Sequence, residues 1–131
     1  MDQTGITKHH IDTGDHPSIR QSLRRHPPPH LQAIKEQTDL MLQQGIIEPA
    51  IRWWTWNVVL VRKKDGSLRF CVEYRRLNEV NKKDSYQLPR IDKCLDAMSG
   101  ARWFPTLYLR SGYHQVLMDE ESRVKTTFIT R

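Results

Sequence analysis

Residues 57–75 read NVVLVRKKDGSLRFCVEYR and encode the clearest local structure in the chain. The run from Asn57 to Lys63 is rich in valine, and apolar and polar residues alternate from Leu68 onward, which is the period of a half-buried strand. Asp65-Gly66 lies between the two runs, and Asp-Gly is a favoured pair in tight hairpin turns. The stretch therefore predicts a β-hairpin with one apolar face and one basic face.

Three cations, Lys63, Lys64 and Arg69, cluster around the predicted turn. The residue pattern leaves two interpretations of this cluster open. It is an edge hairpin kept soluble by its charge, or it is a basic flap that covers phosphate groups.

Two segments have the helical period. The first, residues 29–44, follows a run of prolines and is followed by Gly45, which are good start and stop signals. The second, residues 91–98, has an apolar stripe at steps of three and four. Because such a stripe is typical of a core-facing surface, we expect Cys94 to be a small buried hydrophobe.

Three further strands are predicted, at residues 102–109, 113–118 and 124–130, with residues 119–122 as a polar turn. Pro105 lies inside the first of them and lacks a backbone donor, which is rare in a central strand.

The first thirty residues show neither a helical nor a strand period, and five of the six histidines lie among them. We expect a solvated basic arm rather than a zinc site, because no second pair of ligands has the usual spacing. Further on, the tryptophans Trp53, Trp54 and Trp56 either stack on a nucleic-acid base or pack in the core.

Composition restricts the class of protein. The chain has 131 residues, 37% hydrophobic and 27% charged, and a net charge of +6. No apolar run approaches the roughly 20 residues of a membrane span. Cys71 and Cys94 lie far apart with no signal peptide ahead of them, so we expect reduced thiols. A membrane span, a secreted protein and a disulfide scaffold are disfavoured, and the charge favours a polyanionic partner.

Nine segments, in order, resemble the amino-terminal part of the reverse transcriptase domain in Pol polyproteins of gypsy-class LTR retrotransposons. They are HIDTGD (10–15), RRHPPP (24–29), MLQQGIIEP (41–49), VVLVRKKDGSLRFCV (58–72), YRRLN (74–78), KDSY (83–86), LPRID (88–92), SGYHQV (111–116) and KTTF (125–128).

The resemblance implies a partial right-hand polymerase fold, α+β, with fingers and a truncated palm and an antiparallel sheet with short helices. Residues 1–28 would be an extended linker after a protease region, 29–90 the fingers subdomain, and 91–131 the start of the palm subdomain. The later palm strands, and an Asp-Asp turn that the family uses for catalysis, would lie beyond Arg131.

The resemblance also indicates which residues would form the site. The intact family uses Mg²⁺ held by aspartates, one of them in a Leu-Asp-Leu-x-Ser-Gly-Tyr pattern. Here residues 107–113 read LYLRSGY, so Tyr108 occupies the metal-binding aspartate position. Because a neutral phenol is a poor Mg²⁺ ligand, we expect no intact catalytic set, no bound metal or other cofactor, and no polymerase activity.

Without the metal ligands, the part of the family's site that would remain in this chain is the part that contacts the nucleotide. By resemblance, Lys63, Lys64 and Arg69 contact the incoming triphosphate, and Tyr113 lies under the deoxyribose. Arg75 and Gln87 would approach the template. The chemistry suits these roles, because lysine and arginine bind phosphate oxygens well.

The sequence is therefore identified as a catalytically inactive fragment of an RNA-directed DNA polymerase. The alternatives are a non-specific nucleic-acid-binding remnant, an interaction partner of intact Pol, and a product that does not fold stably. The expected partners are an RNA template, a DNA primer and the rest of Pol, with no membrane. The expected location is intracellular, with cytoplasm, virus-like particle and nucleus all left open.

Overall fold

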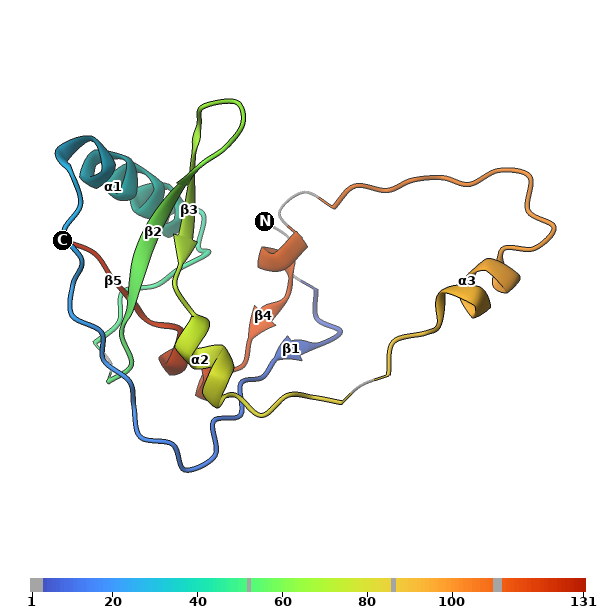
Figure 1. Ribbon diagram of the computed structural model, residues 1–131, viewed down its shortest axis with the longest axis horizontal. Helices are drawn as coiled ribbons and strands as arrows, with labels where there is room; N and C mark the ends of the chain where they lie inside the picture. Colours follow the sequence, from blue (N-terminus) through green and yellow to red (C-terminus); the bar gives the residue numbers. More distant parts are fainter. Residues whose placement is uncertain (1–3, 52, 86, 110–111) are drawn as a thin grey trace.

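A folded body and a long excursion from it make up the chain (Figure 1). The computed structural model describes residues 4–51, 53–85, 87–109 and 112–131. Its elements, in order, are β1 (Lys8–His9), α1 (Pro28–Gln43), β2 (Trp56–Arg62), β3 (Leu68–Val72), α2 (Arg75–Val80), α3 (Ile91–Ala97), η1 (Gly112–Gln115), β4 (Leu117–Met118), α4 (Glu120–Arg123), η2 (Val124–Thr126) and β5 (Phe128–Ile129).

The predicted hairpin is confirmed as β2 and β3, which pair antiparallel from Val58↔Val72 to Arg62↔Leu68. The sheet around it is mixed, because β5 joins the other edge of β2 in parallel, giving the order β3-β2-β5. A second, two-stranded sheet pairs β1 with β4 in parallel.

The prediction of a basic hairpin face is wrong. Paired residues share a face, so the register places Val59 and Cys71, and Val61 and Arg69, on the face opposite Val58. Among the residues paired in the hairpin, that second face therefore carries a single arginine beside Val59, Val61 and Cys71. The lysines lie outside the strands, because β2 ends at Arg62 and the turn takes up residues 63–67.

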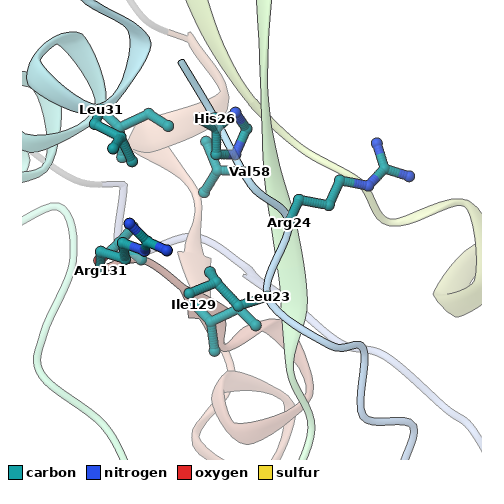
Figure 2. A pocket seen from close by; sticks show the side chains of 9 residues that line it. Leu23, Arg24, His26, Leu31, Val58, Ile129 and Arg131 are labelled. Carbon is teal, nitrogen blue, oxygen red and sulfur yellow. The ribbon is translucent and has the colours of Figure 1, made fainter. Parts of the chain in front are cut away.

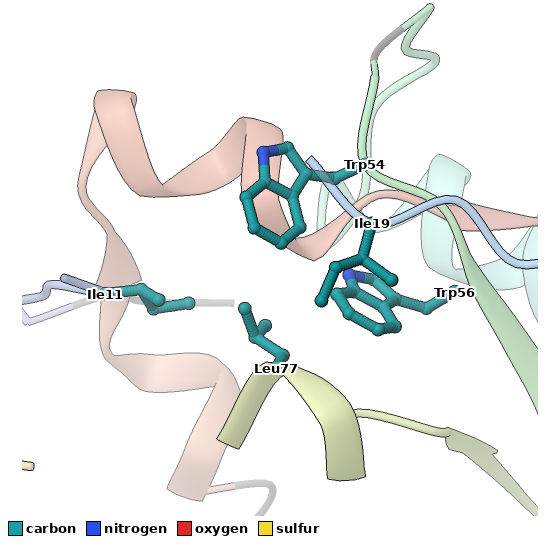
Figure 3. Packing of buried hydrophobic residues seen from close by; sticks show 5 residues of the cluster. All are labelled: Ile11, Ile19, Trp54, Trp56 and Leu77. Carbon is teal, nitrogen blue, oxygen red and sulfur yellow. The ribbon is translucent and has the colours of Figure 1, made fainter. Parts of the chain in front are cut away.

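The core lies where the sheet meets α2 and the N-terminal segment. Figure 3 shows Ile11, Ile19, Trp54, Trp56 and Leu77 converging from three separate stretches of chain. The Trp56 ring lies 6.0 Å from that of Trp54 and 6.1 Å from that of Tyr74, measured between centroids. Two of the three tryptophans are thus core residues, whereas Trp53 is exposed.

The N-terminal segment is not a solvated arm. Ile11, Thr13 and Ile19 are all buried, and the backbone of Arg20 bridges to Thr55. The prediction failed because these residues enter the core singly, at wide spacing, and leave no periodic signal. The proposed boundaries of an extended linker, fingers and palm stay predictions.

Both predicted helices form, but only one of them is covered. Helix α1 buries Ile34 and lies against the β2–β3 hairpin, and Gly45 ends it at a φ of +66°. Helix α3 buries no residue, and Cys94 on it is exposed. The expectation of a buried Cys94 is therefore wrong, because no described element covers the α3 stripe.

The excursion comprises the described residues between Lys83 and His114, and only α3 and the first residues of η1 are regular in it. The strand predicted at 102–109 is absent from its described residues, since Pro105 lacks a donor and no described strand lies beside it. The two later strands shorten to β4 and β5, each preceded by a 3₁₀ turn, and the polar turn at 119–122 falls largely in α4. In the described part of the chain, no helix is both long and apolar enough to cross a bilayer.

Candidate functional site

The hairpin turn is shaped by its own polar groups. The Lys63 amide donates to the Ser67 carbonyl at 2.8 Å, and the Gly66 amide donates to the Lys63 carbonyl at 3.0 Å. Gly66 has a φ of +83°, in the left-handed region that glycine adopts without strain. These bonds close residues 63–67 into a compact tip.

Asp65 completes this tip. Its carboxylate accepts a bond from the Ser67 hydroxyl at 2.6 Å and one from the Ser67 amide at 2.9 Å. These two bonds, the hydroxyl first, lower the pKa of Asp65, and the charge of Lys63 adds to the effect. Asp65 therefore stays ionised at neutral pH and is engaged within the turn.

Three cations surround the tip. Lys63 and Lys64 are exposed on the turn, and Arg69 is exposed on β3, opposite Val61. None of the three forms an ion pair with any residue that the structure describes. The tip projects from the body (Figure 1), so these positive charges are available to an external anion.

Arg75 and Gln87, the proposed template contacts, lie in different parts of the chain, Arg75 in α2 and Gln87 between α2 and α3. Arg75 begins α2, and its guanidinium pairs with the Glu73 carboxylate at 3.0 Å. Gln87 is exposed on the outgoing limb of the excursion, between α2 and α3 in the sequence. The pair with Glu73 offsets part of the charge that Arg75 would present to a phosphate.

Tyr108 and Tyr113 both lie in solvent. Tyr108 is 98% exposed on the returning limb of the excursion, and Tyr113 is 97% exposed in η1. Arg110 and Ser111, which stand between them in the same motif, lie outside the described residues. The described structure thus gathers the three hairpin cations and leaves the two tyrosines without a neighbouring core.

The residues at the expected metal position do not fit Mg²⁺. This ion prefers carboxylate oxygens in octahedral geometry, whereas Tyr108 offers a phenol between Leu107 and Leu109. Among the described residues, no group of three or more His, Cys, Asp or Glu side chains could hold a metal ion. That the chain binds no metal stays a prediction.

A small hollow lies between α1 and the sheet (Figure 2), lined in part by Leu23, Leu31, Val58 and Ile129. Its volume is about 10 Å³, room for about one water molecule. Figure 2 also shows the Arg24 side chain pointing away from these apolar groups. The hollow is too small for a nucleotide, so the hairpin surface remains the candidate site.

Sequence reasoning missed a network of polar contacts around the N-terminal segment. Asn57 is buried, and its side chain bonds to Gln21, Ser22 and Arg24. A second group joins His10 to residues near α4. No spacing rule indicates either group, because the partners lie far apart in the sequence.

Comparison with known proteins finds both a matching family and similar individual proteins. Residues 61–131 match the family described as reverse transcriptase (RNA-dependent DNA polymerase). The chain is 33% identical to the Retrovirus-related Pol polyprotein from transposon 297 of Drosophila melanogaster, over 98% of this chain and 13% of the relative. It therefore spans only a small part of that relative's length.

Solved structures agree on the fold. The native protease–reverse transcriptase of prototype foamy virus superposes with a TM-score of 0.79 and 26% identity, over 98% of this chain and 17% of that chain. The foamy viral protease–reverse transcriptase in complex with dsDNA gives a TM-score of 0.72 at 19% identity, over 97% of this chain and 27% of that chain. The likeness extends over both the body and the excursion.

Proposed function

The chain belongs to the reverse transcriptase (RNA-dependent DNA polymerase) family, and from this premise we propose that it is a retrotransposon reverse transcriptase segment without polymerase activity. The observation that carries the proposal is Tyr108, which stands where the family pattern has a metal-binding aspartate. Polymerisation needs divalent metals to activate the primer hydroxyl and neutralise the phosphates. A neutral phenol supplies no charge for that purpose, and it is bulkier than an aspartate.

The test is extension of a primed RNA template by the purified chain with Mg²⁺ and deoxynucleotides. We expect no product above background, with an active reverse transcriptase run beside it as the positive control. Extension that depends on Mg²⁺ and follows the chain through purification would overturn the proposal.

We also propose that the chain retains non-specific binding to nucleic acid through the hairpin tip. Three observations support this: Lys63, Lys64 and Arg69 are exposed, they lack carboxylate partners among the described residues, and a rigid turn holds the two lysines. The relative bound to dsDNA has the same fold. Lysine and arginine contacts to phosphate release counterions, so binding of this kind weakens as salt increases.

The test is a salt titration of binding to a labelled DNA duplex. Changing Lys63, Lys64 and Arg69 together to Gln should weaken binding and reduce the log–log salt slope by roughly 0.9 for each phosphate that the variant no longer neutralises. The matched control changes Lys35, Lys93 and Arg102, which are exposed elsewhere, to Gln, so the reduction in net charge is equal. Equal effects of the two triple variants would assign binding to overall charge and contradict a hairpin site.

A further inference from the structure

The two stems of the excursion are close to the N-terminal segment. The outgoing stem is Asn81 and Lys82, after α2, and the returning stem runs from Gln115 through β4 to Ser122. The N-terminal segment, residues 4–14, forms hydrogen bonds with both of them. It therefore lies between two parts of the chain that are more than thirty positions apart in the sequence.

Ile11 and Asp12 make this connection with consecutive backbone groups. The Ile11 amide donates to the Ser122 hydroxyl at 2.9 Å, on the returning side. The Asp12 amide donates to the Asn81 side-chain oxygen at 2.9 Å, on the outgoing side. The two carbonyls repeat the pattern, because Ile11 accepts from the Lys125 ammonium at 2.6 Å and Asp12 accepts from the Lys82 amide at 2.7 Å. One dipeptide therefore ties the chain on both sides of the excursion.

Flanking contacts strengthen the returning side. The Thr4 amide donates to the Gln115 carbonyl at 2.8 Å, β1 pairs with β4, and the Asp119 amide donates to the His9 carbonyl at 3.0 Å. His10 Nδ1 lies 2.9 Å from the Asp119 carboxylate. That bond, together with one from the Ser122 hydroxyl, lowers the pKa of Asp119.

Flanking contacts on the outgoing side are fewer but close. The Lys82 ammonium lies 3.4 Å from the Asp12 carboxylate. A Cβ added to Gly14, whose φ is +51°, would lie 3.3 Å from the Lys82 side chain. The lysine chain thus lies along the N-terminal segment where glycine leaves room for it. Ile11 itself is anchored in the core cluster, so the whole connection is fixed to the body.

We propose that residues 4–14 act as a staple, a positioning element that joins the two stems of the excursion and fixes the base from which Tyr113 is presented. Tyr113 precedes Gln115, the first stapled residue of the returning stem, by two positions. The staple follows from the bonds described above and does not rest on the proposed function.

The test breaks the staple on one stem and measures the other, by amide hydrogen exchange detected by NMR. Asn81→Ala removes the acceptor on the outgoing stem, and the readout is the Asp119 amide. His10→Ala removes the bond to Asp119 on the returning stem, and the readout is the Lys82 amide. If the staple acts as a unit, each distant amide exchanges about fivefold faster, the factor for one ordinary hydrogen bond.

Three controls separate positioning from general loosening. The Glu73 amide, which donates to the Asn57 carbonyl within the hairpin, should keep its exchange rate in both variants. Arg90→Ala removes an ion pair of 2.8 Å to Asp92 inside the excursion and should leave both readouts unchanged. His10→Asn places an amide nitrogen near the position of Nδ1 and should restore the slow exchange of Lys82.

An unchanged distant amide in both variants, or an acceleration equal to that of Glu73, would overturn the staple. This outcome is separate from the proposed function. Equal effects of the two triple variants on DNA binding, with the coupled exchange intact, would refute the binding proposal and leave the staple standing.

Discussion

Large apolar side chains occur in both the body and the excursion, but several are buried in the body, whereas those described in the excursion are exposed. In the body, Trp56 and Val58 are almost fully buried, and Ile34 on α1 is 4% exposed. In the excursion, Trp103 is 88% exposed and Ile91 on α3 is 78% exposed. The difference shows that an apolar stripe specifies a helix and its inward face, whereas burial also requires a second element to cover that face.

Removing one tryptophan from each region tests most directly whether the two regions differ in their contribution to stability. Trp56→Ala deletes a buried ring whose indole nitrogen donates to the Lys125 carbonyl at 2.6 Å. We expect a loss of about 3–5 kcal/mol in the free energy of unfolding. Trp103→Ala removes exposed area only and should change the free energy by about 0.5 kcal/mol or less. Urea denaturation measures both, and similar losses would contradict the division of the chain.

The hairpin and α1 were predictable because their signals are local. Alternation along β3, the Asp65-Gly66 pair and the prolines before α1 all act within a few residues of the structure they specify. The three cations of the candidate site were predictable for the same reason, since they sit on or beside a turn. The register places Arg69 opposite Val61, and the hydrogen-bonded turn places the two lysines.

The staple and the excursion were not predictable from those signals. His10 and Ser122 are 112 positions apart, and a single polar contact has no period to detect. In the excursion, residues 102–109 alternate as a strand would, but the described structure gives them no neighbouring strand. A strand without a partner leaves its backbone groups to water, so the pattern alone does not produce one.

A smaller loss of stability should follow from removing the buried side-chain amide of Asn57. This change extends the comparison of body and excursion to polar groups. The side chain accepts from the Arg24 amide at 2.8 Å and donates to the Ser22 carbonyl at 2.9 Å. Asn57→Ala leaves these groups unpaired and should cost about 1–3 kcal/mol of stability. Gln87→Ala, which truncates an exposed amide on the excursion, should have almost no effect in the same denaturation experiment.

Tyr74 extends the comparison to alkaline pH. Its hydroxyl donates to the Thr126 carbonyl at 2.8 Å, and burial raises its pKa to about 12. The unfolded chain loses this proton near pH 10, so it binds fewer protons than the folded chain between about pH 10 and 12. Stability is therefore fully present below pH 10 and is lost as the pH rises through that window.

The variant Tyr74→Phe removes this titration and one hydrogen bond. At neutral pH it should lose about 1 kcal/mol of stability, and between pH 10 and 12 its stability should fall less steeply than that of the wild type. Tyr113→Phe, at a tyrosine that is 97% exposed, is the control and should retain the wild-type decline. Urea midpoints measured from pH 8 to 12 test both, and a parallel decline in all three proteins would contradict the assignment to Tyr74.

The smallest change in stability should follow from substituting Asp119, where the returning stem joins the body. Its pKa is lowered, first by the His10 bond and then by the Ser122 hydroxyl, from an ordinary value of 3.8. A carboxyl with a lowered folded-state pKa stabilises the protein above the unfolded value, and that contribution is lost as the pH falls through the folded value. Asp119→Asn should therefore be less stable at neutral pH and should lose less of its stability on acidification.

Asp92→Asn is the matched change inside the excursion, since Asp92 pairs with Arg90 at 2.8 Å without joining two segments of the fold. The pair of variants tests whether acidification destabilises the protein only by weakening the contacts that hold the excursion to the body. If it does, the urea midpoints of Asp119→Asn from pH 6 to 3 should differ from those of the wild type, and those of Asp92→Asn should not. A flatter acid profile in Asp92→Asn would mean that ion pairs within the excursion also stabilise the fold, and the two regions would then be one cooperative unit.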